Sequence, residues 1–163
     1  INNCQFWFIE GLKKSITTSF KNRITKICHC HNVSFDKYFL FHPRINTFDF
    51  FNLIKQSDII LDSLEWSGGK TSLEAIALNK PIVTLPGELM RGRYTYGILK
   101  FLNLEQTIAS SKKEYVEIAI KLATDKNFRN MISNKIKINK NSLYNDETPI
   151  RFLEQFFKNE FKI

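Results

Sequence analysis

The residues with the clearest chemical potential lie between two apolar runs near the middle of the chain, in the sequence Gly68-Gly69-Lys70-Thr71-Ser72. Two glycines let a backbone approach a ligand closely, and the free N–H groups and positive dipole end of a following helix attract phosphate. Thr71 and Ser72 add hydroxyl donors, and Lys70 adds a charged contact. This combination predicts a phosphate-binding loop at the start of a helix.

Glu74 follows the loop by about one helical turn, where a carboxylate can accept hydrogen bonds from two neighbouring ribose hydroxyls. The glycine spacing fits neither a Walker A loop nor the dinucleotide fingerprint, so the pattern favours a sugar nucleotide. A second interpretation stays open from spacing alone. In it, Gly68-Gly69 forms a tight turn, Lys70 is solvated and Glu74 supports the first turn of the helix from the surface.

The elements that must position this loop are short apolar runs separated by helical patterns. Strands are expected at 5–9, 37–42, 58–62 and 81–85, with helices at 15–27, 47–56 and 70–78. Strands that are apolar throughout, each followed by a helix, indicate a parallel sheet covered on both faces. The expected fold is a doubly wound α/β domain, whose ligands bind at the carboxyl ends of the strands.

Two helical patterns carry specific expectations about which side chains are buried. In the first helix, Ile16, Phe20, Ile24 and Ile27 follow each other at spacings of three and four, which indicates one apolar face. Beyond residue 88 we expect helices at 94–102, 112–123 and 150–161, with a fifth strand at 104–109. The last helix, opened by Pro149, should turn Phe152, Leu153, Phe156 and Phe157 inward.

Length and composition favour one domain over residues 1–163, in which 145–163 is a terminal packing helix. The 163 residues are 43% hydrophobic and contain neither a membrane-length apolar run nor a signal-peptide pattern, so a cytoplasmic protein without a membrane partner is expected. An odd number of cysteines favours reduced thiols.

The net charge of +8 raises the possibility of a nucleic-acid partner. Lys and Arg number 8, 7 and 9 in residues 1–60, 61–120 and 121–163, against 4, 7 and 5 Asp and Glu. The excess lies in the flanks and is spread over helical segments, whereas a nucleic-acid site usually concentrates it. We therefore expect no nucleic-acid partner.

The run Cys28-His29-Cys30-His31 offers four sulfur and nitrogen donors within one short segment. One-residue spacing departs from the usual zinc pattern. The frayed end of a helix is favoured over a metal site, and no metal ligands are predicted.

The sequence DIILDSLEWSGGKTSLEAIALNKPIVTLPGELMRGRYTYGILKFLNL, residues 58–104, resembles the donor-site core of the O-linked N-acetylglucosamine transferase and SPINDLY glycosyltransferases. A strand that ends in aspartate, the Gly-Gly-x-Thr-Ser-Leu-Glu-Ala helix start, the Pro-Ile-Val-Thr-Leu-Pro-Gly-Glu strand and a following Arg-Gly-Arg occur in order. A weaker resemblance extends from residue 6 to about residue 157.

This resemblance implies the C-terminal Rossmann-like domain of a GT-B glycosyltransferase, incomplete at its N-terminus. It implies a UDP-sugar donor, no cofactor, no metal and transfer of a sugar, N-acetylglucosamine above all, to Ser or Thr of acceptor proteins. Acceptors would bind through N-terminal helical repeats outside the chain. The fragment alone is expected to be inactive, because the family's base candidates come from segments that would precede residue 1.

The resemblance also assigns roles to individual residues. Gly68 to Thr71 would contact the diphosphate, with Lys70 as a possible stabiliser of its departure, and Glu74 would lie near the ribose. The backbone of Arg44-Ile45 would face the uracil edge. Phe50 falls where relatives stack an imidazole on the base, and it could offer a π face or pack in the core. The remaining catalytic residues are unknown.

Two further points stay open. Arg91 and Arg93 follow the end of the fourth strand, so they either reach the site or are solvated. The other functional hypotheses are a non-catalytic nucleotide-binding domain that lacks its partner domain and, least favoured, a basic nucleic-acid-binding protein.

Overall fold

A computed structural model of the chain describes residues 4–161. The chain divides into two compact units, Ile1–Leu53 and Ile54–Ile163. Helix α3 (Thr47–Gln56) runs across the boundary between them in sequence and begins after Asn46, whose Oδ1 accepts a hydrogen bond from the Asp49 N–H at 2.9 Å. Asn46 thus caps the first turn of the helix with its side chain.

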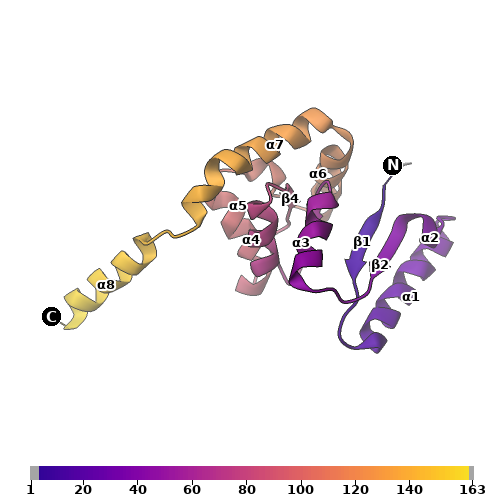
Figure 1. Cartoon of the computed structure of the whole chain (residues 1–163), viewed down its shortest axis with the longest axis horizontal. Helices are drawn as coiled ribbons and strands as arrows, with labels where there is room; N and C mark the ends of the chain where they lie inside the picture. The colour runs from indigo at the N-terminus through magenta and orange to yellow at the C-terminus, as the bar shows by residue number, and fades with distance from the viewer. Residues whose placement is uncertain (1–3, 162–163) are drawn as a thin grey trace. The chain divides into compact units, whose positions relative to one another are not determined.

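The first unit is built on two parallel strands, β1 (Phe6–Ile9) and β2 (Phe39–His42), with Phe6 opposite Phe39 and Ile9 opposite His42. Helix α1 (Lys14–Cys30) connects them and lies along the pair (Figure 1), and the short helix α2 (Phe35–Tyr38) precedes β2. Stacked and edge-on phenylalanines hold the unit together: Phe6, Phe8, Phe20, Phe35, Phe39 and Phe41. Both predicted strands and the helix between them are confirmed.

The predicted apolar face of α1 is only partly correct. Phe20 packs edge-on against Phe8 at 5.2 Å, but Ile16 and Ile27 are exposed. A 17-residue helix is about 25 Å long and a four-residue strand about 13 Å, so the strands underlie only part of the helix.

The second unit places helix α4 (Lys70–Ala77) between two very short parallel strands, β3 (Ile60–Leu61) and β4 (Ile82–Val83). The predicted fifth strand is reduced to one parallel bridge between Thr84 and Ile108, because the 3₁₀ turn η2 (Glu105–Thr107) occupies most of its length. Thr84 still donates its N–H to the Thr107 carbonyl at 3.1 Å. Parallel pairs connected through helices confirm the α/β class.

Helices cover this unit: α5 (Tyr94–Phe101), α6 (Lys112–Thr124) and α7 (Lys126–Asn139), with the 3₁₀ turns η1 (Met90–Gly92) and η3 (Lys140–Leu143). Sequence patterns predict α5 and α6 within two residues at each end, whereas α7 was not specified. The fully buried side chains come from nearly every element: Ile76, Ile82, Val83, Leu99, Leu102, Leu104, Leu122, Ile132 and Ile136. This is the hydrophobic core of the unit.

The last helix, α8 (Thr148–Phe161), forms as predicted, but the expected burial of its apolar face is wrong. Each of Phe152, Leu153, Phe156 and Phe157 is at least 47% exposed. Amphipathic spacing identifies an apolar face, but it does not supply the surface that would cover that face. No helix within residues 4–161 combines the length and apolar character that a membrane span requires.

We expect Leu122→Ala to lower the free energy of unfolding by about 2–5 kcal/mol, because the side chain is fully buried and its removal leaves a cavity. Ile120→Ala on the same helix is the matched control; this side chain is 44% exposed, so the loss should stay below about 1 kcal/mol. Urea denaturation measures both, and equal losses would contradict the assignment of the core.

Candidate functional site

The loop between β3 and α4 is organised by the buried carboxylate of Asp62, which directly follows the strand. Its Oδ2 accepts hydrogen bonds from Thr84 Oγ1 at 2.6 Å and Ser67 Oγ at 2.8 Å, and its Oδ1 accepts one from the Gly68 N–H at 2.8 Å. A buried charge is costly unless it is hydrogen-bonded, and three donors meet that requirement. The carboxylate thereby ties the glycine loop to the end of both strands.

A second layer of hydroxyl groups connects the same loop to helix α5. The Thr95 N–H donates to Ser67 Oγ at 2.9 Å, Thr95 Oγ1 donates to the Gly68 carbonyl at 3.1 Å, and Ser72 Oγ lies 2.8 Å from Thr95 Oγ1. Because Ser67 donates its proton to Asp62, it is free to accept from the Thr95 N–H. Ser67, Ser72 and Thr95 are all buried, so the network is shielded from water.

Helix α6 contacts the other side of Asp62. The Tyr115 hydroxyl donates to the Asp62 backbone carbonyl at 2.8 Å. Burial, with a smaller contribution from the Asp62 charge, raises the pKa of Tyr115 well above its ordinary value, so the phenol stays protonated and able to donate. Asp62 is therefore held through both its side chain and its backbone.

This framework borders a pocket of about 360 Å³. Its lining comes from the end of β3, the loop and the first turn of α4: Ile60, Leu61, Asp62, Ser63, Trp66, Ser67, Gly68, Gly69, Lys70, Thr71 and Ser72. Four of the predicted site residues, Gly68 to Thr71, thus lie together. Their position at the carboxyl end of a parallel strand is the place where α/β folds bind ligands.

The two glycines of the loop have different roles. A Cβ added at Gly68 would lie 2.5 Å from Ser72 Oγ and 2.7 Å from Thr71 Oγ1, whereas one added at Gly69 would have no described atom within 4 Å. Gly68 is therefore required for packing, and Gly69 leaves open space at the start of α4. No side chain in the described part of the chain caps that helix at Gly69, so its first N–H groups remain available.

Lys70 and Glu74 form an ion pair one helical turn apart, with Lys70 Nζ 3.5 Å from Glu74 Oε1. The Lys70 side chain is 81% exposed, whereas that of Glu74 is 12% exposed. The lysine can therefore move toward an anion in the pocket. The carboxylate is held close to the helix surface and keeps further acceptor positions for a ligand.

Arg91 and Arg93, whose roles the sequence left undecided, lie at different places in the structure. The Arg91 guanidinium lies 5.9 Å from the centre of the Trp66 ring, and Trp66 lines the pocket. Arg93 donates to the Gly87 carbonyl at 2.9 Å and stacks on Tyr96. Arg91 is thus beside the candidate site, while Arg93 faces elsewhere.

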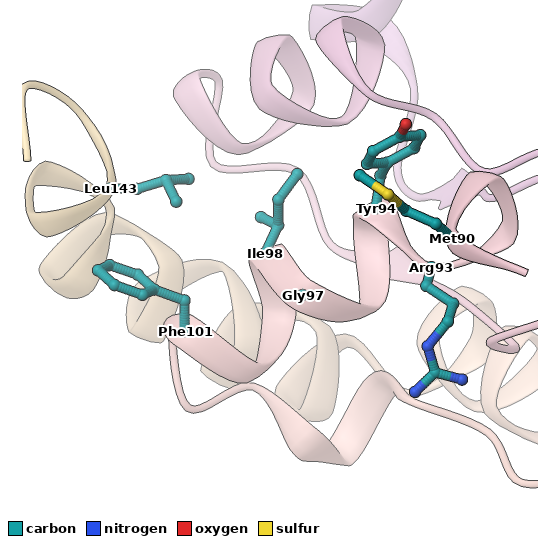
Figure 2. Close-up of a pocket in the computed structure, with 7 residues that line it drawn as sticks. All are labelled: Met90, Arg93, Tyr94, Gly97, Ile98, Phe101 and Leu143. Atoms are coloured by element: carbon teal, nitrogen blue, oxygen red, sulfur yellow. The ribbon is translucent and has the colours of Figure 1, made fainter. Parts of the chain in front are cut away.

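Arg93 lies instead at a second pocket of about 420 Å³ along α5 (Figure 2). Figure 2 shows Tyr94, Ile98 and Phe101 on one helix, with Leu143 opposite them and Met90 beside Tyr94. The lining of this pocket is mostly apolar and lacks the glycine loop, so it has none of the features expected of a phosphate site.

The remaining predicted site residues belong to the first unit. Arg44 is exposed, and Ile45 and Phe50 are half-buried. The half-buried Phe50 is compatible with either of its two interpretations. The uracil-facing role of all three residues stays a prediction.

The Cys28-His29-Cys30-His31 run forms the last turn of α1 and its C-cap, as the favoured interpretation predicts. Cys28 is buried, and the other three side chains are exposed. Within residues 4–161 no group of three or more His, Cys, Asp or Glu side chains is arranged to hold a metal ion.

Sequence reasoning did not anticipate the roles of Ser67, Thr95 and Trp66. In the sequence alone, nothing about a serine before a glycine pair or a threonine at the start of a helix indicates that the two side chains meet. The aspartate at the end of the strand was the one available signal, because an acidic residue there needs donors nearby.

The fold and the site together define an α/β protein with a glycine loop between a parallel strand and a helix. Glycosyl transferase family 41 matches residues 21–148, so the chain belongs to this family. The structure is similar to that of a mutant O-GlcNAc transferase from Thermobaculum terrenum, with a TM-score of 0.74 and 25% identity over 85% of this chain and 27% of that one. This likeness confirms the predicted Rossmann-like domain of a GT-B glycosyltransferase.

Curated relatives carry the same family resemblance. The chain is 37% identical over 68 residues to a probable UDP-N-acetylglucosamine–peptide N-acetylglucosaminyltransferase SPINDLY of Solanum lycopersicum, and 32% identical over 69 residues to the UDP-N-acetylglucosamine–peptide N-acetylglucosaminyltransferase of Caenorhabditis elegans. Each match covers 42% of this chain. The matched stretches span only 7% and 6% of those relatives' own lengths.

We expect Gly68→Ala to lower the free energy of unfolding by about 1–3 kcal/mol, because the new methyl group overlaps the Thr71 hydroxyl and the Ser72 hydroxyl, the second of which Thr95 holds in place. Gly69→Ala, the matched control, should change it by less than about 1 kcal/mol, since its methyl group meets open space. Thermal and urea denaturation of the two variants make the comparison. A Gly69 variant as unstable as the Gly68 variant would contradict the different roles of the two glycines.

Proposed function

We propose that this chain binds the UDP-sugar donor of a protein O-glycosyltransferase that transfers N-acetylglucosamine to Ser or Thr of acceptor proteins. The observation that carries the proposal is the pocket at the start of α4, where Gly69 leaves open space beside uncapped helix N–H groups. The relatives are named UDP-N-acetylglucosamine–peptide N-acetylglucosaminyltransferases, which supports this choice of donor and acceptor.

The diphosphate is the part of the donor that suits this pocket. Helix N–H groups and the positive end of the α4 dipole favour an anion, and the Thr71 hydroxyl adds a donor on the same turn. Asp62 is the one acidic side chain among the described residues that line the pocket, and its carboxylate is already hydrogen-bonded within the loop. These donors offset part of its negative charge beside the ligand.

Lys70 would act mainly on the departing diphosphate. Negative charge grows on the leaving group as the glycosidic bond breaks, so a mobile ammonium stabilises the transition state more than the bound donor. We propose that neither a metal nor another cofactor takes part, with the helix N-terminus and Lys70 supplying the positive charge.

Glu74 would bind the ribose. Its nearly buried carboxylate lies one turn into α4, with Lys70 Nζ 3.5 Å from its Oε1. The other acceptor positions can receive hydroxyl groups. Acceptor binding and the catalytic base belong, in this proposal, to parts of the transferase outside these 163 residues.

Titration calorimetry with UDP, with and without EDTA, tests the proposal directly. Binding that persists in EDTA supports a metal-independent donor site, whereas the absence of UDP binding contradicts it. Binding without transfer activity, once the rest of the catalytic region is supplied, would favour the non-catalytic nucleotide-binding alternative.

Replacing Glu74 with Ala should weaken UDP binding by about 1–3 kcal/mol, since charged hydrogen bonds to the ribose would be lost. The matched control is Glu117→Ala on α6, which removes an ion pair of the same i,i+4 spacing, Lys113–Glu117 at 3.8 Å. Calorimetry should show unchanged affinity for the control. An unchanged affinity for the Glu74 variant as well would remove the ribose assignment.

Lys70→Met should cost UDP binding only about 1 kcal/mol, because backbone N–H groups supply most of the affinity and the exposed lysine adds a solvated contact. In a transferase containing the whole catalytic region, the same change should reduce the single-turnover rate by a larger factor than the donor affinity. Lys113→Met serves as the control. Equal losses in affinity and rate would mean that Lys70 only holds the donor.

A further inference from the structure

Thr95, the second residue of α5, is fully buried and contacts the glycine loop, but it is not among the described residues that line the pocket at the start of α4. Its Oγ1 lies 3.1 Å from the Gly68 carbonyl oxygen, 2.8 Å from Ser72 Oγ and 2.9 Å from Ser67 Oγ. A threonine has few χ1 rotamers, and the Thr95 N–H donates to Ser67 Oγ at 2.9 Å, so the hydroxyl is fixed relative to the helix. Thr95 can therefore influence a ligand only through the loop.

The partners of these hydroxyl groups determine where each proton points. The Gly68 carbonyl can only accept, so Thr95 donates its one proton there and its Oγ1 accepts from Ser72 Oγ. Ser67 gives its proton to the Asp62 carboxylate, because a charged acceptor makes the stronger hydrogen bond. The Ser72 proton is thus directed at Thr95 and is not free for a ligand. The network has one direction, and it ends on the Gly68 carbonyl.

The hydrogen bond from Thr95 fixes the orientation of the peptide group between Gly68 and Gly69. Glycine on both sides would otherwise let this peptide group rotate easily. A trans peptide group is planar, and its C=O and N–H point in opposite directions. Because the Gly68 carbonyl is directed at Thr95, the Gly69 N–H is directed away from α5. Gly69 lines the pocket, and within residues 4–161 its N–H makes no hydrogen bond.

We propose that Thr95 is a positioning residue for donor binding, whose hydroxyl holds the Gly68–Gly69 peptide group so that the Gly69 N–H donates to the diphosphate; this inference rests on the proposed function. A hydrogen bond to an anionic oxygen is stronger than one to a neutral acceptor. A donor that already points at the ligand loses little conformational freedom on binding. Without the Thr95 hydroxyl the peptide group could turn, and the N–H would lose its fixed direction.

Titration calorimetry with UDP on variants of the full chain tests this role. Thr95→Val has nearly the same shape but lacks the hydroxyl, and it should raise the Kd for UDP about tenfold because one charged hydrogen bond is weakened. Thr95→Ser keeps the hydroxyl and should bring the Kd to within about twofold of the wild-type value. The matched control is Thr107→Val. Thr107 is also fully buried and donates to a backbone carbonyl, that of Leu104 at 3.3 Å, but it does not line the pocket, so this variant should lose stability without losing affinity.

A nitrogen–proton correlation spectrum reports on the Gly69 N–H itself and needs no variant. UDP should shift the Gly69 amide signal of the wild-type chain more than that of Gly87, whose N–H already donates to the Gly92 carbonyl at 3.0 Å. Uridine lacks the diphosphate and should leave the Gly69 signal in place. In Thr95→Val the shift caused by UDP should shrink, whereas Thr95→Ser should retain it.

The outcomes separate this inference from the proposed function. If the wild-type chain does not bind UDP, both are overturned. If it binds UDP and Thr95→Val keeps the wild-type Kd, the positioning role alone is overturned. Equal losses of affinity in Thr95→Val and Thr107→Val overturn it too, because stability would then explain both. A Gly69 amide signal that UDP does not shift in the wild-type chain overturns it even if Thr95→Val fails to fold.

Discussion

The hydrogen bonds of one buried carboxylate, Asp62, determine the shape of the candidate site. The chain leaves β3 directly into a loop that must turn toward α4, and the loop has few apolar side chains to hold it. Asp62 provides the constraint, because its two oxygens accept hydrogen bonds from Thr84, directly after β4, and from Ser67 and Gly68 on the loop. A charged acceptor makes stronger hydrogen bonds than a neutral one, and burial away from water strengthens them further. The glycine loop is thereby positioned before any ligand arrives.

The same arrangement explains how one acidic residue can border an anion site. The Asp62 carboxylate accepts hydrogen bonds from residues of the protein itself. The surface left for a ligand consists of backbone N–H groups, hydroxyls and the exposed Lys70. Such a site is preorganised by the backbone and needs only one lysine. The chain's net charge of +8 lies mostly in its flanking thirds, so it does not contribute to this pocket directly.

Thr95 and Tyr115 show how helices distant in sequence support the loop. Thr95 lies 28 residues after Ser67 and Tyr115 53 residues after Asp62, yet both contact the loop backbone or its serine directly. Each contact fixes one end of the segment that contains Trp66 and the glycines. Substitutions at these helices would therefore affect the pocket without touching a ligand, through the geometry of its wall.

The sequence by itself determined the first four strands, the helices between them, the glycine loop and the place of Glu74 in helix α4, because periodicity and turn chemistry act over a few residues. Only the tertiary structure decided which side chains are buried, since the phenylalanines of α8 are exposed. It also decided strand pairing, since the predicted fifth strand is a single bridge at Thr84. The distant partners of Asp62 also emerged only in three dimensions, because its contacts with Thr84 and Tyr115 join residues 22 and 53 positions apart. Local patterns cannot encode such distances, whereas packing of the helices on the strands brings those residues together.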